Sequence, residues 1–313
     1  MQSTLLCLSA VVLGAAAQSG TPENAFPLIH FILYTNSQNL SYPIANASDL
    51  PADPSFDTNK PTALYVHGWR ESNQSESAGV MSRAFLQRGS HNFILLDWGP
   101  YVAGPYFTSY QRLPAVGAAV GAAVMRMVDA GLSPETFWPI GHSLGGQLCG
   151  NLAGNINFTL NRMTGLDPAV SANPAIPQLS RDDAVLVDVI HTDAGFNGYD
   201  GNDGTIDFWP NGGRRPQPGC RFGETDFYNA LTLCSHQRSW RFFAESVNSE
   251  TAFPAVSCPS WLAFQSGSCP VDDNNIVYMG YAAADTNHTG TFYLRTAASQ
   301  PYGLGMGGAR PLV

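Results

Sequence analysis

A serine flanked by glycines is the residue of this sequence best placed to do chemistry. It stands in the run Gly141-His142-Ser143-Leu144-Gly145-Gly146. The pattern Gly-x-Ser-x-Gly is typical of a sharp strand-to-helix turn that holds the serine hydroxyl exposed above a sheet. An ordinary glycine-rich turn has the same composition, so the context must decide. The run lies between an expected strand at 137–140 and an expected helix at 144–152, which favours a nucleophile at Ser143.

A carboxylate suited to such a serine follows it in the chain. A serine hydroxyl needs a general base, and the base needs an orienting carboxylate. Asp167 follows an expected strand at 162–166 and precedes a proline, so we expect it at the carboxyl end of a strand, where the sites of parallel sheets gather. The alternative is a turn or helix-cap role, which is common for Asp beside Pro.

Three histidines follow Asp167. His191 ends a strongly apolar run, His236 opens an expected helix, and His288 lies within a glycosylation sequon, which predicts an exposed side chain. Residue type and spacing do not separate His191 from His236 as the base.

A second glycine motif, Tyr65-Val66-His67-Gly68-Trp69-Arg70, ends an early strand expected at 63–67. One donor of an oxyanion hole comes from such a loop, and the other is the N–H that follows the nucleophile. The backbone N–H groups of Trp69 and Leu144 are therefore the expected donors. The alternative for Trp69 is an indole that simply packs on the core.

The elements that must position these residues alternate along the chain. Expected strands lie at 30–35, 63–67, 93–97, 137–140, 162–166, 184–191 and 206–209, and expected helices at 116–130, 144–152 and 237–247. Strands that alternate with helices predict an α/β fold with a mostly parallel central sheet and helices on both faces. No repeat or linker marks a second domain, so one domain is expected over 18–313, with short strands and turns from about 251 onward.

Composition and leader indicate an exported protein. The net charge of −9 argues against nucleic-acid binding and against electrostatic capture by anionic membranes.

Residues 1–17 form an apolar run with small residues at its end, which predicts a signal peptide, although the run lacks the usual early Lys or Arg. No later apolar run is long enough to cross a membrane. Five sequons support export: Asn39, Asn46, Asn73, Asn157 and Asn287.

Removal of the leader leaves five cysteines. In an oxidising compartment the short-range pairs Cys220–Cys234 and Cys258–Cys269 are expected, and Cys149 is then the odd thiol, expected to be buried on a helix.

The sequence resembles the pancreatic-type animal lipases, and most closely their shorter arthropod members. The segments that carry the resemblance run in order across about residues 25–300: YVHGW, LLDWG, GHSLGG, TGLDPA, VDVIHTD, DFWPNGG, PGC and CSHQRS. The resemblance implies an α/β-hydrolase fold and a secreted enzyme that cleaves fatty-acyl esters of lipids without a cofactor. It implies Ser143 as nucleophile, Asp167 as carboxylate and His236, rather than His191, as general base. Trp69 and Leu144 match the two oxyanion donors.

Two departures from the family pattern bear on partners and metals. Larger members carry a C-terminal β-sandwich for docking, for which this chain has no room, so no colipase-like partner is expected. The family's calcium loop offers Asp side chains where this chain has residues 179–183, and of these only Asp183 matches a ligand. Arg181 adds a positive charge beside it, so no bound calcium or other metal is expected.

The lid segment is the third departure. Residues 221–233, 13 in number, separate Cys220 from Cys234, fewer than in full triglyceride lipases, and the facing loop 194–206 is short and polar. Short lids in this family resemble those of phospholipase A1 and galactolipase members, so triacylglycerol and phospholipid both remain candidate substrates. The segment's apolar side chains predict either a lip that meets a lipid interface or plain packing over the cleft: Phe222, Phe227, Tyr228, Leu231 and Leu233.

The rival hypothesis from another class is a catalytically silent lipid-binding or yolk-type storage protein, because the family includes members that lost the serine. Here the serine, carboxylate, histidine and both oxyanion positions are present. The sequence therefore favours an enzyme.

Overall fold

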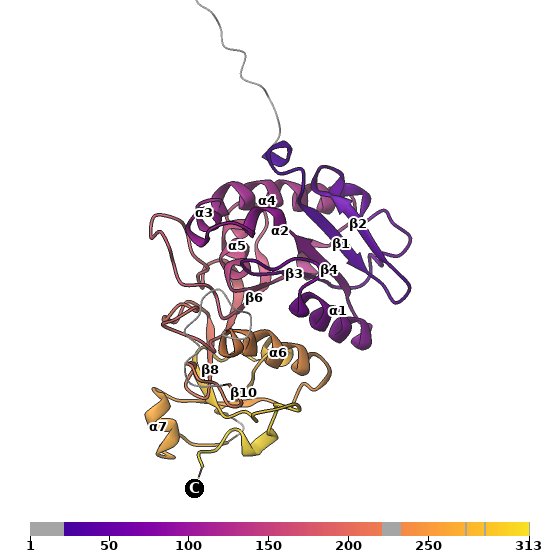
Figure 1. The fold of residues 1–313 in the computed structure, drawn as a ribbon. Coiled ribbons are helices and arrows are strands. Elements are labelled where there is room, and N and C mark those ends of the chain that lie inside the picture. Colours follow the sequence, from indigo (N-terminus) through magenta and orange to yellow (C-terminus); the bar gives the residue numbers. More distant parts are fainter. Residues whose placement is uncertain (1–21, 221–232, 273, 285, 313) are drawn as a thin grey trace, which may run out of the picture.

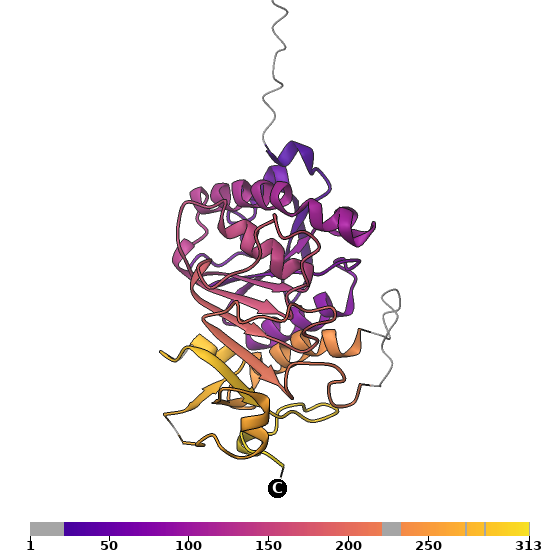
Figure 2. The same cartoon turned by 90° about the vertical axis from the view of Figure 1, so that its left-hand side faces the viewer.

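A single sheet of 11 strands organises the molecule. The computed structural model describes residues 22–220, 233–272, 274–284 and 286–312. The strand order is β10-β9-β11-β8-β7-β6-β5-β3-β4-β1-β2. The first strands and the last strands therefore lie at opposite ends of the sheet, indigo and yellow in the two views (Figure 1, Figure 2).

The centre of the sheet is parallel and its edges are antiparallel. The parallel strands are β3 (Thr62–Val66), β4 (Asn92–Asp97), β5 (Phe137–His142), β6 (Leu160–Leu166), β7 (Ala184–Ile190), β8 (Ile206–Pro210) and β11 (Gly290–Leu294). The antiparallel strands are β1 (His30–Tyr34), β2 (Asn39–Pro43), β9 (Pro254–Ser257) and β10 (Ile276–Tyr278). A parallel core of this kind needs helical connections that cross over the sheet.

Helices cover both faces of the sheet (Figure 1). The longer ones are α1 (Glu76–Arg88), α4 (Leu113–Asp129), α5 (Leu144–Ala153) and α6 (Cys234–Asn248), and the shorter ones are α2 (Gly99–Val102), α3 (Tyr106–Gln111) and α7 (Trp261–Gln265). Successive strand residues point to opposite faces. Leu64 and Val66 accordingly share a core with α4 and α5, while Ala63 and Tyr65 share another with α1 and α6.

The expected strands and helices are confirmed, with shifts of a few residues at their ends. One strand and four helices were not expected: β2, α1, α2, α3 and α7. Residues 18–60 were expected to hold one strand, but β2 pairs with β1 along its whole length. Its side chains alternate between exposed and half-buried, so it carries little apolar signal. Helix α1 buries Met81 and Phe85, and its other buried residues are Ser or Ala, so its apolar pattern is weak.

The expected disulfides Cys220–Cys234 and Cys258–Cys269 are confirmed, and Cys149 is a free, buried thiol on α5. The first disulfide anchors the first residue of α6, the helix that carries His236. In the described part of the chain, no helix combines the length and apolarity needed to cross a membrane.

Candidate active site

Ser143 occupies the turn between β5 and α5 as the sequence predicted. It is the one residue between the two elements, and its backbone is left-handed, with φ 54° and ψ −122°. The turn leaves no room for side chains at the flanking glycines. A Cβ on Gly145 would lie 2.1 Å from the carbonyl oxygen of Val66, and one on Gly141 would lie 2.4 Å from that of Gly145. The strained turn is the arrangement expected of a nucleophile elbow.

Asp167 follows β6 directly, again with a left-handed backbone (φ 48°). Its side chain is fully buried. The Oδ1 atom accepts hydrogen bonds from the backbone N–H groups of Thr192, at 2.7 Å, and Asp193, at 3.0 Å. These two donors fix the carboxylate so that its other oxygen, Oδ2, points to His236.

His236 lies in the first turn of α6 and pairs with Asp167. Its Nδ1 atom lies 2.5 Å from Asp167 Oδ2, and the ring is buried. Burial on its own lowers the pKa of this imidazole, but the hydrogen bond and charge of Asp167 raise it above the ordinary value, helped by the charges of Asp193 and Glu71. The pairing with Asp167 makes the neutral ring a stronger proton acceptor, which suits a general base.

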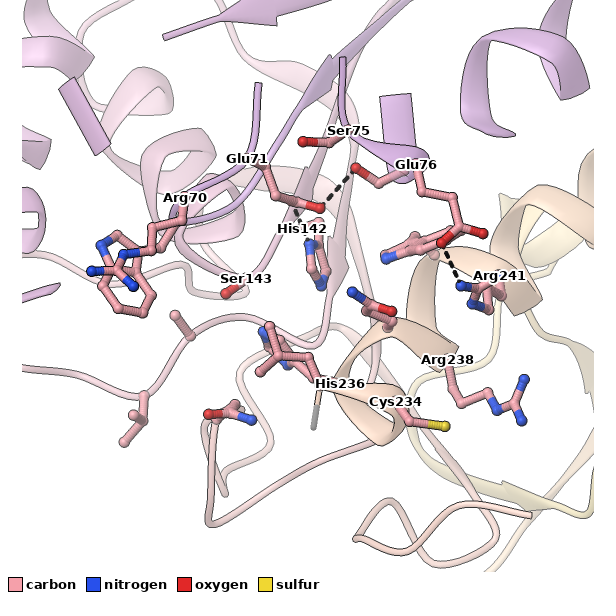
Figure 3. A pocket seen from close by; sticks show the side chains of 18 of the residues that line it. Arg70, Glu71, Ser75, Glu76, His142, Ser143, Cys234, His236, Arg238 and Arg241 are labelled. Carbon is pink, nitrogen blue, oxygen red and sulfur yellow. Dashed lines mark hydrogen bonds and ion pairs between the residues drawn. The ribbon is translucent and has the colours of Figure 1, made fainter. Parts of the chain in front are cut away.

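Ser143 and His236 line the same cavity, which has a volume of about 700 Å³ (Figure 3). Within the described residues, the structure contains no hydrogen bond between the Ser143 hydroxyl and the His236 ring. Such a bond is often long or poorly aligned in a site without substrate and tightens when substrate binds. The Ser143 hydroxyl and the His236 ring therefore face the same cavity but form no hydrogen bond with each other in the described residues.

The backbone N–H groups of the two expected oxyanion donors form no hydrogen bond within the described residues. Leu144 is the first residue of α5, so its N–H has no acceptor within the helix. For neither Leu144 nor Trp69 does the described part of the chain supply an acceptor for the backbone N–H. The Trp69 indole lines the cavity, packs on the core beside Tyr106 and donates from Nε1 to the carbonyl of Gly104 at 2.8 Å.

His191 is placed away from this arrangement. Its Nε2 atom lies 2.8 Å from Asp207 Oδ1, and its ring stacks on Trp209 with centroids 4.0 Å apart. Both partners are buried. The fold thus brings His236, and not His191, to Asp167. His288 is exposed, as expected from its sequon.

Two charged residues beside the site were not identified from the sequence. Glu71 lies between the loop after β3 and His142, and Asp193 lies near His236 with its charge paired to Arg215. No local pattern marks either one, because the partners that place them beside the site, His142 for Glu71 and Arg215 for Asp193, are distant in the chain.

The carboxylates near His236 also bear on the expectation of no metal. Potential ligand atoms of Asp167, Asp193 and His236 lie within 4.8 Å of one another. Each is already engaged, Asp193 by Arg215 and the other two by one another. In the loop 179–183, Asp183 accepts the N–H of Ser180 at 2.7 Å. The absence of a bound metal stays a prediction.

Most of the lid segment lies outside the described residues. This applies to Phe222, Phe227, Tyr228 and Leu231, so the expected apolar lip is untested there. Leu233, next to α6, lines the cavity.

The parallel sheet, the strand-to-helix serine turn and the buried His–Asp pair together define an α/β hydrolase. A sequence model of the family described as Lipase matches residues 11–302, and the chain belongs to this family. The expected resemblance to pancreatic-type lipases is thereby confirmed.

Three curated relatives illustrate the likeness. Pancreatic triacylglycerol lipase of Oryctolagus cuniculus is 33% identical over 300 residues, which cover 87% of this chain and 64% of that protein. Pancreatic lipase-related protein 2 of Cavia porcellus is 32% identical over 292 residues, covering 87% and 65%. Inactive pancreatic lipase-related protein 1 of Canis lupus familiaris is 31% identical over 309 residues, covering 87% and 64%. The chain spans just under two thirds of the length of these relatives.

Proposed function

We propose that this protein is a secreted serine hydrolase that cleaves fatty-acyl esters of lipids through an acyl-enzyme on Ser143. The observation that carries the proposal is the 2.5 Å pair of His236 and Asp167, set beside an elbow serine on one cavity. The triacylglycerol lipase among the relatives supports an ester of fatty acid as the substrate.

In the proposed mechanism the Ser143 hydroxyl attacks the ester carbonyl while His236 Nε2 takes its proton. Asp167 holds the imidazole through Nδ1 and stabilises the imidazolium. The N–H groups of Trp69 and Leu144 bind the oxyanion of the tetrahedral intermediate. His236 then protonates the leaving alcohol, and a water molecule releases the fatty acid by the same steps in reverse order.

The lining of the cavity is consistent with the binding of an apolar acyl group beside Ser143. Apolar and aromatic side chains line the cavity: Trp69, Tyr106, Ala169, Val170, Leu233 and Trp240. Polar and charged residues also line it, including Glu76, Gln237 and Arg241. We propose that the apolar side takes the acyl chain of a lipid in a micelle or at an interface.

The choice between triacylglycerol lipase and phospholipase A1 rests on the lid. The short segment between Cys220 and Cys234 favours a broad or phospholipid-accepting enzyme. We propose no colipase-like partner and no cofactor.

Export is proposed from the leader at 1–17, with one domain over 18–313. The two disulfides support an oxidising compartment. All five sequon asparagines are exposed in the structure, as acceptors of N-glycans must be.

A substrate panel tests this function. Purified protein is assayed on triolein, phosphatidylcholine and galactolipid in mixed micelles, and the released fatty acid is measured with its position of origin. We expect release from at least one of the three lipids, and none from Ser143→Ala. Binding of lipid without release would instead support a catalytically silent lipid-binding or storage protein; one relative is named an inactive lipase-related protein.

A further inference from the structure

The carboxylate of Glu71 bridges the loop after β3 and the nucleophile turn (Figure 3). Its Oε2 atom accepts a hydrogen bond from the backbone N–H of Gly68 at 2.6 Å and lies 3.0 Å from Nδ1 of His142. Its Oε1 atom accepts a hydrogen bond from the Ser77 hydroxyl at 2.9 Å. Glu71 therefore contacts three segments that meet at the cavity.

Two of these contacts involve the neighbours of proposed catalytic groups. Gly68 precedes Trp69, whose N–H is one oxyanion donor, and His142 precedes Ser143. The two segments are in close contact, since a Cβ on Gly68 would lie 3.0 Å from Ser143 Cβ and 3.0 Å from Glu71 Oε2. A small movement of the loop would therefore change the distance between the oxyanion donor and the nucleophile.

The loop is not held by regular structure. Arg70 has a left-handed backbone (φ 59°), an uncommon conformation for a side chain of this size. Strain of this kind persists only where surrounding contacts enforce it. The hydrogen bond from Gly68 to Glu71 is such a contact, and it spans the loop.

The carboxylate is ionised although little of it is exposed. Burial works to raise its pKa, but His142, then His67 and the N–H of Gly68, lower the pKa of Glu71 to about 2. Hydrogen bonds to an ionised acceptor are stronger than neutral ones. The ring of His142 in turn packs on that of His236, with centroids 4.7 Å apart, which brings the charge of Glu71 close to the proposed base.

We propose that Glu71 is a positioning residue for acyl transfer, which fixes the oxyanion donor of Trp69 against Ser143 by bridging Gly68 and His142. The inference rests on the proposed function. Because an oxyanion exists in the transition state and not in the bound ester, a displaced donor lowers kcat more than it raises KM.

Two variants distinguish the role of the Glu71 charge from the role of its contacts with Gly68 and His142. Glu71→Gln keeps the size of the side chain and removes the charge, whereas Glu71→Asp keeps the charge and withdraws it from Gly68. On a soluble p-nitrophenyl ester we expect both to lower kcat about 10- to 100-fold, with KM within about threefold of the wild-type value. Glu250→Gln is the control, since Glu250 loses the same charge but pairs with Arg88 on the surface, outside the cavity.

The pH profile separates the effect of the Glu71 charge on His236 from the effect of the contacts that Glu71 makes. Glu71 is one of the charges that raise the pKa of His236. Glu71→Gln should therefore shift the acid limb of kcat/KM to lower pH, and Glu71→Asp should leave it in place. Other charged or titratable groups lie on the elements around this pair and are unchanged in both variants: Tyr65, His67, Glu76, His142, Asp167, Asp193 and Arg241.

Two results would overturn the inference. One is a kcat close to the wild-type value in both variants. The other is a loss of kcat that is fully explained by a smaller folded fraction, measured by thermal unfolding of the same samples. If Glu71→Gln does not fold, Glu71→Asp decides through its kcat. Wild-type protein that does not hydrolyse the ester would refute the proposed function instead, so the two failures are distinguishable.

Discussion

Ser143 and His236 face one cavity, and Asp167 lies directly behind His236. Residue types and spacing predicted the serine and the aspartate, because each follows a strand in a recognisable local pattern. The choice of histidine could not be made in that way, since His191 and His236 both occupy plausible positions. The fold decides it by giving His191 a different carboxylate, Asp207.

Removal of the nucleophile should abolish catalysis without unfolding the protein. Ser143 has a small side chain at the cavity surface. Its hydroxyl forms no hydrogen bond with the described residues, so its removal should not weaken the fold. We expect Ser143→Ala to lower kcat on a soluble ester about 10⁴- to 10⁶-fold. Thermal unfolding of the same sample is the control, and an active variant in a clean preparation would reject the assignment.

The two histidines should respond differently to substitution. His236→Ala removes the proposed base, so turnover by the folded protein is expected to disappear, and the loss of the buried partner of Asp167 should also lower the free energy of unfolding. His191→Ala removes one partner of a buried pair and should lower the free energy of unfolding by about 3 kcal/mol, with the activity of the folded fraction retained. Kinetics and urea unfolding of both variants check this. The reverse pattern would move the base to His191.

The pH dependence of the reaction follows from the surroundings of His236. The pKa of its imidazole is raised above its ordinary value of 6.5, against burial, chiefly by Asp167. Because a general base must be neutral, kcat/KM should fall as the pH falls through this pKa. We therefore expect the midpoint of the acid limb above pH 6.5, measured on a soluble ester. A midpoint well below that value would contradict the proposed pairing.

Strands and helices were predicted where burial gives the sequence a strong apolar signal, as in β3, β5 and β7. The signal fails for β2, which is held by backbone pairing at the sheet edge, and for α1, whose buried residues other than Met81 and Phe85 are Ser or Ala. Helix α1 matters for the site because Ser77, in its first turn, holds Glu71. The contact of Glu71 with His142 could not be predicted, since the two residues are distant in the chain and only the folded sheet brings them together.

The nucleophile turn should not tolerate a side chain at Gly145. A Cβ there would lie 2.1 Å from a backbone oxygen of β3, which cannot move without disturbing the sheet. We expect Gly145→Ala to lower the free energy of unfolding by about 3 kcal/mol or more. Gly154→Ala is the matched control, because the nearest atom to its Cβ lies 3.8 Å away and its φ of −68° suits alanine. Urea unfolding compares the two, and equal stabilities would contradict this description of the turn.

The surface of the whole molecule agrees with export. Charged residues are 12% of the chain, the net charge is −9, and the five sequon asparagines are spread over exposed positions. With this charge, contact with an anionic lipid surface must come from apolar groups rather than from charge attraction.

Glycosylation offers a test at this level. When the chain is secreted from eukaryotic cells, we expect its N-terminus to begin after residue 17 and its mass to fall on treatment with peptide N-glycosidase. Intact-mass measurement before and after treatment checks both points. Secreted protein of unchanged mass that retains residues 1–17 would contradict the proposed export signal and glycans.

The most direct test of the account is whether Ser143 is an activated nucleophile. A fluorophosphonate reacts with a serine that a neighbouring base activates and much more slowly with an ordinary hydroxyl. Labelled protein is digested and the modified peptide is mapped by mass spectrometry. We predict one phosphonyl group per chain, on Ser143, and loss of labelling in His236→Ala. A folded wild-type protein that stays unlabelled, or that carries the label on another residue, would contradict the central claim.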